Sequence, residues 1–265
     1  MQCLEGQDER NTFFCSVLRK LNEIKDLFLV GGTCLLERYT GIVRPTKDLD
    51  IYVRRADLKA IFEMLNASGY QTELSFSHWL GKIYKGEHFV DVIFNSGNGL
   101  CQVDQEWFDH AVPGKILGVP VRFCAPEETI WSKAFLMERE RYDGADLAHL
   151  LLAWGKRMDW QRLLRHFGPH WRVLLSHLVL FGFIYPTERH VIPEWVLGEL
   201  FDRLRSETDG PRSKNRLCRG TLLSRIQYLH DIEHVGYKDA RLMPFGSLTA
   251  EEAIEWTAAA LNEDC

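Results

Sequence analysis

The stretch that decides the fold is Leu29–Val53, LVGGTCLLERYTGIVRPTKDLDIYV. An apolar run ends at the paired glycines Gly31 and Gly32, and Thr33 then opens a helical segment. A strand that enters a helix through glycines leaves backbone N–H groups free at the helix start. These groups and the helix dipole together form an anion-binding corner. The sequence therefore predicts a strand, a phosphate-binding turn and a helix over residues 27–39.

The same stretch closes on a second predicted strand over residues 48–53, in which Asp48 and Asp50 alternate with Leu49 and Ile51. Because successive side chains of a strand point to opposite faces, the two aspartates share one face. Oxygen ligands of this kind suit Mg²⁺ or Mn²⁺ rather than Zn²⁺. A phosphate corner beside metal-binding carboxylates is typical of phosphoryl or nucleotidyl transfer. We therefore expect a metal-dependent transferase that acts on a nucleoside triphosphate (NTP).

The composition supports a folded protein with a substantial core, because 46% of the 265 residues are hydrophobic and 12% are aromatic. No run of eighteen apolar residues occurs, which argues against a membrane span, and the polar, acidic start MQCLEGQDER is unlike a signal peptide. The seven cysteines are scattered without a CxxC pair, as expected for reduced thiols in a cytoplasmic protein. The net charge of -5 argues against a constitutive nucleic-acid binder.

The pattern of the chain changes near residue 125. Before it, helical and strand patterns mix, with expected helices at 11–24, 33–39 and 56–68 and expected strands at 27–30, 48–53, 70–74, 80–84, 88–94 and in a hairpin over 112–123. After it, the periodicity is helical, at 126–141, 144–155, 159–166, 170–181, 193–206, 217–235 and 250–262. We expect an α/β (α+β) catalytic domain over residues 1–125 with a mixed sheet of about five strands, then an all-helical domain over residues 126–265.

A third carboxylate, Asp91, lies between valines in the predicted strand 88–94. Paired glycines, an Asp-x-Asp pair fifteen residues after Thr33, and then a lone strand aspartate resemble the nucleotidyltransferase superfamily, which includes DNA polymerase β, poly(A) polymerases and small bacterial nucleotidyltransferases. The Arg-x-Thr at Arg44 and the later segment GVPVRF…EETIW are similar to aminoglycoside nucleotidyltransferases.

The helices that follow carry a second resemblance. Lys133 and Arg139, with the acidic residues Asp143 and Asp146, resemble the abortive-infection toxin branch of the superfamily, in which a lysine and an acidic residue follow the core. The local sequence supports another interpretation, in which Asp143 and Asp146, on either side of Gly144, cap the start of a helix. The resemblance covers roughly residues 12–152.

The resemblance implies a two-metal reaction with pyrophosphate as the leaving group. The implied metal ligands are Asp48, Asp50 and Asp91, and Asp91 would also accept the proton of the attacking hydroxyl. The implied nucleotide-binding groups are Gly31, Gly32, Thr33, Arg44, Lys47 and Lys133.

The acceptor remains open at this stage. A small molecule such as an aminoglycoside-like alcohol is favoured over RNA, because the net charge is negative. The alternatives are a toxin-type enzyme that modifies tRNA or a protein, and a non-catalytic nucleotide-binding protein on the same fold. A tRNA substrate would need basic residues, and the best candidates are Lys156-Arg157, Arg162, Arg165 and the run Arg212–Arg219.

Other motifs are weak or missing. The sequence has neither a GxxxxGK[ST] nor a GxGxxG pattern, so neither a P-loop nor a dinucleotide-binding fold is indicated. His230 and His234 fit the HxxEH zinc-protease signature, but only about thirty residues remain in which a further acidic ligand could lie, so surface histidines are the favoured interpretation.

Overall fold

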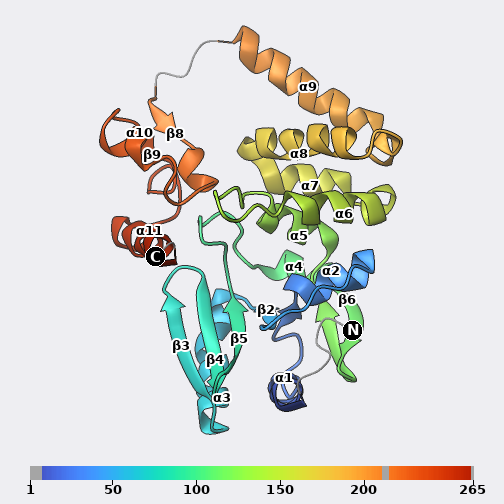
Figure 1. The fold of residues 1–265 in the computed structure, drawn as a ribbon, viewed down its shortest axis with the longest axis vertical. Coiled ribbons are helices and arrows are strands. Elements are labelled where there is room, and N and C mark those ends of the chain that lie inside the picture. Colours follow the sequence, from blue (N-terminus) through green and yellow to red (C-terminus); the bar gives the residue numbers. More distant parts are fainter. Residues whose placement is uncertain (1–7, 211–214, 264–265) are drawn as a thin grey trace. The chain divides into compact units, whose positions relative to one another are not determined.

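The computed structural model describes residues 8–210 and 215–263 and divides into two compact units, one ending at Ala125 and one starting at Pro126. The first unit holds a mixed sheet of seven strands within the described residues, in the order β3-β4-β5-β2-β1-β7-β6 (Figure 1). The strands are β1 (Leu29–Val30), β2 (Asp50–Tyr52), β3 (Gln71–Phe76), β4 (Leu80–Lys85), β5 (His88–Ile93), β6 (Val112–Ile116) and β7 (Val119–Phe123).

The sheet combines parallel and antiparallel pairs, as expected for an α/β (α+β) domain. Strand β2 runs parallel to β5, and β1 runs parallel to β7, whereas the other neighbouring pairs are antiparallel. The expectation of about five strands was too low, because the hairpin of β6 and β7 joins the same sheet through the pairing of Val30 with Phe123.

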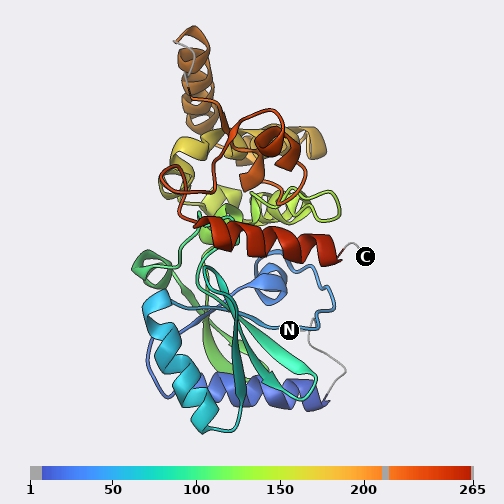
Figure 2. The same cartoon turned by 90° about the vertical axis from the view of Figure 1, so that its left-hand side faces the viewer.

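Helices of the first unit are α1 (Asp8–Leu21), α2 (Gly32–Thr40), α3 (Leu58–Ala67), which follows a 3₁₀ turn at Arg55–Asp57, and α4 (Gln105–Asp109). Helices α1 and α3 lie side by side along the sheet (Figure 2). The periodicity that predicts α1 also defines its buried face, made by Phe13, Phe14, Val17, Leu18 and Leu21. The sequence pattern missed α4, a short helix whose start is capped by the Asp104 carboxylate.

The second unit is mainly helical. Its helices are α5 (Pro126–Lys133), α6 (Gly144–Trp154), α7 (Trp160–Phe167), α8 (Trp171–Ile184), α9 (Glu194–Asp209), α10 (Leu229–Glu233) and α11 (Ala250–Glu263), with 3₁₀ turns at Gly155–Arg157, Gly168–His170, Arg189–Val191 and Gly220–Leu222. Helix α11 starts with a capping box, in which Glu252 N–H donates to Thr249 Oγ1 and Thr249 N–H donates to Glu252 Oε2.

Two predicted helices differ from the structure. The helix expected over 126–141 ends at Lys133, because the Met137 N–H donates to the Leu223 carbonyl and the chain then turns back through a bridge between Met137 and Tyr142. The helix expected over 217–235 is wrong. Its start forms β8 (Leu217–Cys218), which pairs with β9 (Lys238–Asp239), and only α10 is helical near its end.

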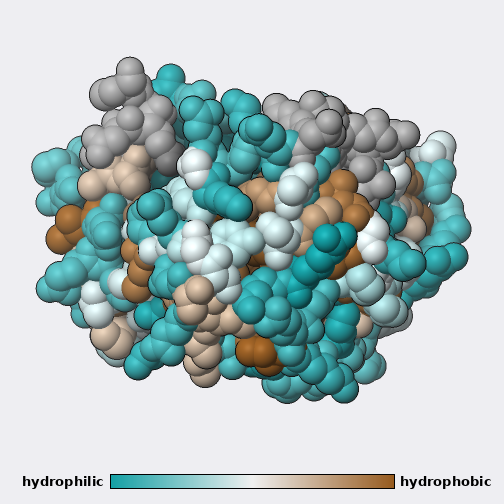
Figure 3. Space-filling view, turned by 90° about the horizontal axis from the view of Figure 1, so that it is seen from below, coloured by the Kyte–Doolittle hydropathy of each residue, from teal (hydrophilic) through white to brown (hydrophobic). Residues whose placement is uncertain are grey.

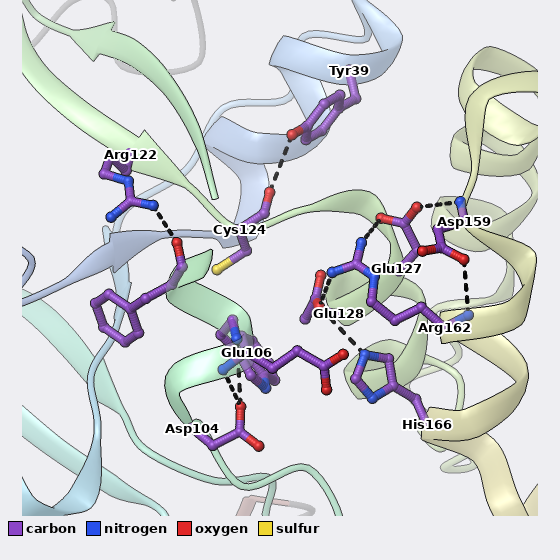
Figure 4. A network of polar contacts seen from close by, with 12 residues as sticks. Tyr39, Asp104, Glu106, Arg122, Cys124, Glu127, Glu128, Asp159, Arg162 and His166 are labelled. Carbon is purple, nitrogen blue, oxygen red and sulfur yellow. Dashed lines mark hydrogen bonds and ion pairs between the residues drawn. The ribbon is translucent and has the colours of Figure 1, made fainter. Parts of the chain in front are cut away.

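Buried ion pairs join α5 to α7 (Figure 4). Arg162 Nη2 lies 2.6 Å from Glu127 Oε2, and Arg162 Nη1 lies 2.6 Å from Glu128 Oε1. Glu127 Oε1 also accepts from the Asp159 N–H at 2.7 Å, and His166 Nε2 lies 3.3 Å from Glu128 Oε1. Arg162 was one of the basic residues considered for RNA binding. Only 3% of its side chain is exposed, so it is not available for such contacts. Residues 212–214 of the basic run Arg212–Arg219 lie outside the described residues.

The surface shows no extended apolar face in the view of Figure 3, where hydrophobic side chains form small groups among hydrophilic ones. No helix among the described residues is both long enough and apolar enough to cross a membrane.

Candidate metal and nucleotide site

The corner between β1 and α2 is built on the two glycines. Gly31 precedes the first residue of α2, and its N–H donates to the Asp50 carbonyl at 3.1 Å. Gly32 has a φ of +58°, a left-handed conformation that favours glycine. A methyl group at position 32 would lie 1.7 Å from Asp50 Oδ2, and one at position 31 would lie 2.2 Å from the Tyr52 ring. Glycines are therefore required here because side chains of β2 lie directly over the helix start.

The strand β2 presents its aspartate as the alternation predicts. Leu49, Ile51 and Val53 are buried in the core, whereas Asp50 is half-buried on the other face. Asp50 and Asp91 are paired across the parallel strands β2 and β5, which places their side chains next to each other on that face. The lone strand aspartate and the Asp-x-Asp pair thus meet through the register of the sheet.

Asp48 completes a cluster with Asp50 and Asp91. One carboxylate oxygen from each of the three lies within 4.8 Å of the other two, and all three residues are half-buried. Thr46 Oγ1 donates to Asp48 Oδ1, and the Thr46 carbonyl accepts from Arg10 Nη1 at 2.6 Å, so the loop before Asp48 is anchored to α1.

The donor set of this cluster fits a hard divalent cation. Three carboxylates without histidine or cysteine suit Mg²⁺ or Mn²⁺. Within residues 8–210 and 215–263, no other group of three such side chains converges closely enough to hold a metal ion. His230 and His234 therefore do not form part of a three-residue metal site within these residues.

Lys82 is a site residue that the sequence analysis missed. It lies on β4 directly opposite Asp91 of β5, and its Nζ is 2.9 Å from Asp91 Oδ1. Burial raises the pKa of Asp91, a neighbouring charge at Asp48 adds to this, and the Lys82 ammonium opposes it. The sequence does contain a signal for Lys82. Lys85 and His88 form the pair next to the turn at Gly86, and three further steps away from the turn along both strands bring residue 82 opposite residue 91.

The predicted cations lie in different parts of the chain. Arg44 and Lys47 are exposed in the loop that leads from α2 to Asp48. Lys133 belongs to the second unit, where its Nζ lies 2.6 Å from Asp143 Oδ2 and 2.9 Å from Asp146 Oδ2. Burial alone would raise the pKa of Asp143, but Lys133 and Arg141 outweigh it and hold this pKa below its usual range. A role for Lys133 in binding the triphosphate stays a prediction.

The mixed sheet, the glycine corner and the converging aspartates together define a protein of the nucleotidyltransferase class. The chain belongs to the family described as "Uncharacterised nucleotidyltransferase", which matches residues 20–170. It is therefore an enzyme that transfers a nucleoside monophosphate (NMP). The match includes the aspartate cluster and continues through α5, α6 and α7 of the second unit. No curated protein matches the chain.

Several solved structures are similar to part of this chain. The antibiotic-resistance factor ANT(2'')-Ia in solution is 17% identical to this chain, with a TM-score of 0.42. The alignment covers 64% of this chain and 96% of the ANT(2'')-Ia chain. The lincosamide antibiotic adenylyltransferase LnuA, with lincomycin bound, is 15% identical over 54% of this chain and 95% of its own, with a TM-score of 0.38. JHP933 from Helicobacter pylori is 13% identical over 77% of this chain and 98% of its own, with a TM-score of 0.35.

Proposed function

We propose that this nucleotidyltransferase uses Mg²⁺ or Mn²⁺ to transfer an NMP from an NTP to a hydroxyl group of an acceptor. The observation that carries the proposal is the convergence of Asp48, Asp50 and Asp91 beside the glycine corner of α2. These are the two parts that nucleotidyl transfer needs, a place for metal and a place for phosphate. We assign this catalytic part to residues 1–125 and treat residues 126–265 as a separate helical domain.

The donor would bind at the start of α2. The N–H groups of Gly32 and Thr33 lie at the positive end of this helix, and the φ of Gly32 shapes the turn there. We assign the β- and γ-phosphates to these N–H groups and to the Thr33 hydroxyl. Arg44 and Lys47, which are exposed in the following loop, are the candidate cations nearest in sequence.

The reaction would follow from the positions of the three carboxylates. Asp48 and Asp50 would hold the divalent ions, and Asp91 would complete one of the metal sites. When bound, the ions would stabilise charge on the attacking and leaving oxygens. Asp91 would take the proton of the acceptor hydroxyl. The raised pKa that burial gives this carboxyl suits a proton acceptor. The acceptor oxygen forms a bond to the α-phosphorus while the bond to the β-phosphate oxygen breaks, and pyrophosphate leaves.

For the acceptor, we favour a small neutral or cationic molecule over RNA. The net charge is -5, and Arg162, one of the basic residues considered for RNA binding, is neutralised inside the second unit. A strongly negative polymer binds through basic surface, which this composition does not favour.

The test combines donors, acceptors and one matched pair of variants. Purified protein is incubated with each α-labelled NTP, Mg²⁺ and panels of hydroxyl-bearing small molecules, tRNA and proteins, and labelled product and pyrophosphate are measured. We expect one class of acceptor to be labelled and Asp50→Asn to lose more than ~100-fold of the rate, while Asp109→Asn, at the end of α4, keeps it. Retained turnover in Asp50→Asn would refute the metal assignment. Absence of both NTP and Mg²⁺ binding would refute the proposed reaction.

A further inference from the structure

The ring of Tyr52 lies against the glycine corner. Tyr52 follows Asp50 by two residues on β2, so both side chains lie on the face of the sheet that carries the aspartate cluster. A methyl group on Gly31 would lie 2.2 Å from Cε2 of the Tyr52 ring and 2.9 Å from Cδ2. Gly31 has a φ of -130°, outside the left-handed region. The ring of Tyr52 is therefore what leaves room only for glycine at this position.

A tryptophan of α4 holds this ring from a second element. The rings of Tyr52 and Trp107 are stacked, with their centres 5.2 Å apart and an angle of 24° between their planes. Aromatic rings attract each other in tilted or offset-stacked arrangements. Trp107 is only 1% exposed, whereas Tyr52 is half-buried. Tyr52 is therefore in contact with a core residue as well as with Gly31.

Helix α4 is itself fastened to the neighbouring strands. It has five residues, too few for a helix that is stable by itself. Arg54, just after β2, donates from Nη1 to Gln105 Oε1 at 2.8 Å, and its guanidinium lies 4.2 Å from the centre of the Phe108 ring. Arg122 of β7 donates to the Phe108 carbonyl. These contacts fix the position of Trp107 relative to β2.

We propose that Tyr52 and Trp107 are positioning residues of the donor site. The stacked pair fixes the turn at Gly31, so that the N–H groups of Gly32 and Thr33 stay aligned for the phosphates. Both side chains act through the backbone of the turn. This inference rests on the proposed function, because it assumes that the phosphates of the NTP bind at the start of α2.

The experiment measures the binding of tripolyphosphate to the full chain with Mg²⁺ by calorimetry, because this probe carries the phosphates of an NTP without a base. Tyr52→Val removes the ring atoms that face Gly31 and keeps a side chain that suits a strand. We expect it to weaken tripolyphosphate binding by about tenfold, since small displacements of a binding group have large effects. Tyr52→Phe keeps the ring and should keep the affinity. Mn²⁺ binding without tripolyphosphate should stay unchanged in both variants.

The matched control is Tyr70→Val. Tyr70 is also a half-buried tyrosine, with its ring centre 6.0 Å from that of Phe13 and its hydroxyl donating to Ser16 Oγ at 2.9 Å. Tyr70→Val should lower the temperature of unfolding and leave tripolyphosphate binding unchanged. Circular dichroism and thermal unfolding show that each variant is folded.

A double-mutant cycle tests the contact directly. Gly31→Ala displaces the Tyr52 ring without removing it and should also weaken tripolyphosphate binding. In the Tyr52→Val background the ring is absent, so Gly31→Ala should have a much smaller effect. Gly31→Ala also carries the test if Tyr52→Val does not fold, and an unchanged affinity in this variant would overturn the inference.

The outcomes separate this inference from the proposed function. Equal tripolyphosphate affinities of the wild type and folded Tyr52→Val, or additive losses in the cycle, would overturn the positioning role and leave the proposed function in place. A Tyr52→Phe protein that behaves like Tyr52→Val would also overturn it, because the ring would then not be the cause. A parallel loss of Mn²⁺ binding in Tyr52→Val would indicate general disruption of the site and contradict the inference. A wild-type protein that binds neither tripolyphosphate nor any NTP would overturn both.

Discussion

Clusters of acidic and basic residues occur in both units, but their charges are balanced differently. In the first unit, three aspartates converge with a single lysine, Lys82. In the second unit, two cations with little exposure each contact two carboxylates: Lys133 contacts Asp143 and Asp146, and Arg162 contacts Glu127 and Glu128. These contacts join α5 to α6 and to α7. We propose that similar residue types serve two purposes, a metal site in the first unit and structural ion pairs in the second.

The comparison teaches how to recognise a site among structural ion pairs. In the second unit, Arg141 adds a further cation 3.5 Å from Asp143, and His166 lies beside Glu128. The acidic side chains there contact basic side chains of the same unit. In the first unit, three aspartates are brought together by strand register and by close packing against Gly32. We propose that this convergence of carboxylates serves a ligand.

The largest expected effect is on the stability of the second unit. Arg162→Met leaves Glu127 and Glu128, which are 5% and 0% exposed, without their cation. Breaking a buried ion pair in this way costs about 3–5 kcal/mol. Urea unfolding should show this loss, while Mn²⁺ binding in the folded variant stays unchanged. The matched control is Arg172→Met, whose pair with Glu207 is half exposed and should cost less than about 1 kcal/mol. Equal losses in the two variants would contradict the assignment of the Arg162 network as structural.

Lys133→Met tests whether the second cation is also structural. It leaves Asp143 and Asp146 facing each other at 12% and 7% exposure, and we expect a loss of about 3 kcal/mol in the free energy of unfolding. The measurement is urea unfolding together with NTP affinity in the folded variant. If NTP affinity falls much more than it does in Arg162→Met, Lys133 binds the triphosphate as the sequence predicted, and the contrast between the units is weaker than described.

The glycine corner gives a prediction with a control at the other end of α2, where Gly41 follows the last helical residue. Gly32→Ala and Gly41→Ala both place a side chain at a left-handed φ, of +58° and +73°, which costs about 1–2 kcal/mol. Only at Gly32 would the new methyl group meet Asp50, since nothing lies within 4 Å of one at Gly41. Thermal unfolding should therefore shift in both variants and further in Gly32→Ala, because Asp50 must move, whereas Mn²⁺ binding should fall in Gly32→Ala alone. A Gly32→Ala protein with normal Mn²⁺ binding would show that Asp50 does not depend on this contact.

The smallest effect concerns pH. The pKa of Asp143 is held below its ordinary value of 3.8, so the folded state binds its proton less readily than the unfolded state. Its contribution to stability is therefore fully present above the unfolded pKa and is lost as the pH falls through the folded pKa. Urea unfolding between pH 6 and pH 3 should show that the second unit weakens at the acidic end. The dependence should be flatter in Asp143→Asn, and an unchanged slope would contradict the role of this carboxyl.

The sequence was sufficient for the parts of the molecule that local patterns determine. Alternation along residues 48–53 predicted which side chains of β2 are buried, because a strand has a period of two. The glycine pair and the Asp-x-Asp pair predicted the class of fold and its chemistry, and the family match agrees with that class. Helical periodicity located α6, α7, α8, α9 and α11 within a few residues.

The sequence analysis missed Lys82, although the turn at Gly86 sets the register of β4 and β5 that pairs it with Asp91. Contacts between distant segments account for the other differences. The end of α5 depends on the Leu223 carbonyl, which accepts a hydrogen bond from Met137. The segment near Cys218 looks helical in isolation, but pairing with Asp239 makes it a strand. Tertiary contacts override local propensity in each case.

The central claim is that Asp48, Asp50 and Asp91 form a metal site for nucleotidyl transfer. The most direct measurement is anomalous diffraction from crystals grown with Mn²⁺ and an NTP analogue that resists cleavage between its α- and β-phosphates. We predict Mn²⁺ peaks within bonding distance of these three carboxylates, with the phosphates at the N–H groups of Gly32 and Thr33. Mn²⁺ bound elsewhere, or a nucleotide bound away from the start of α2, would contradict the account.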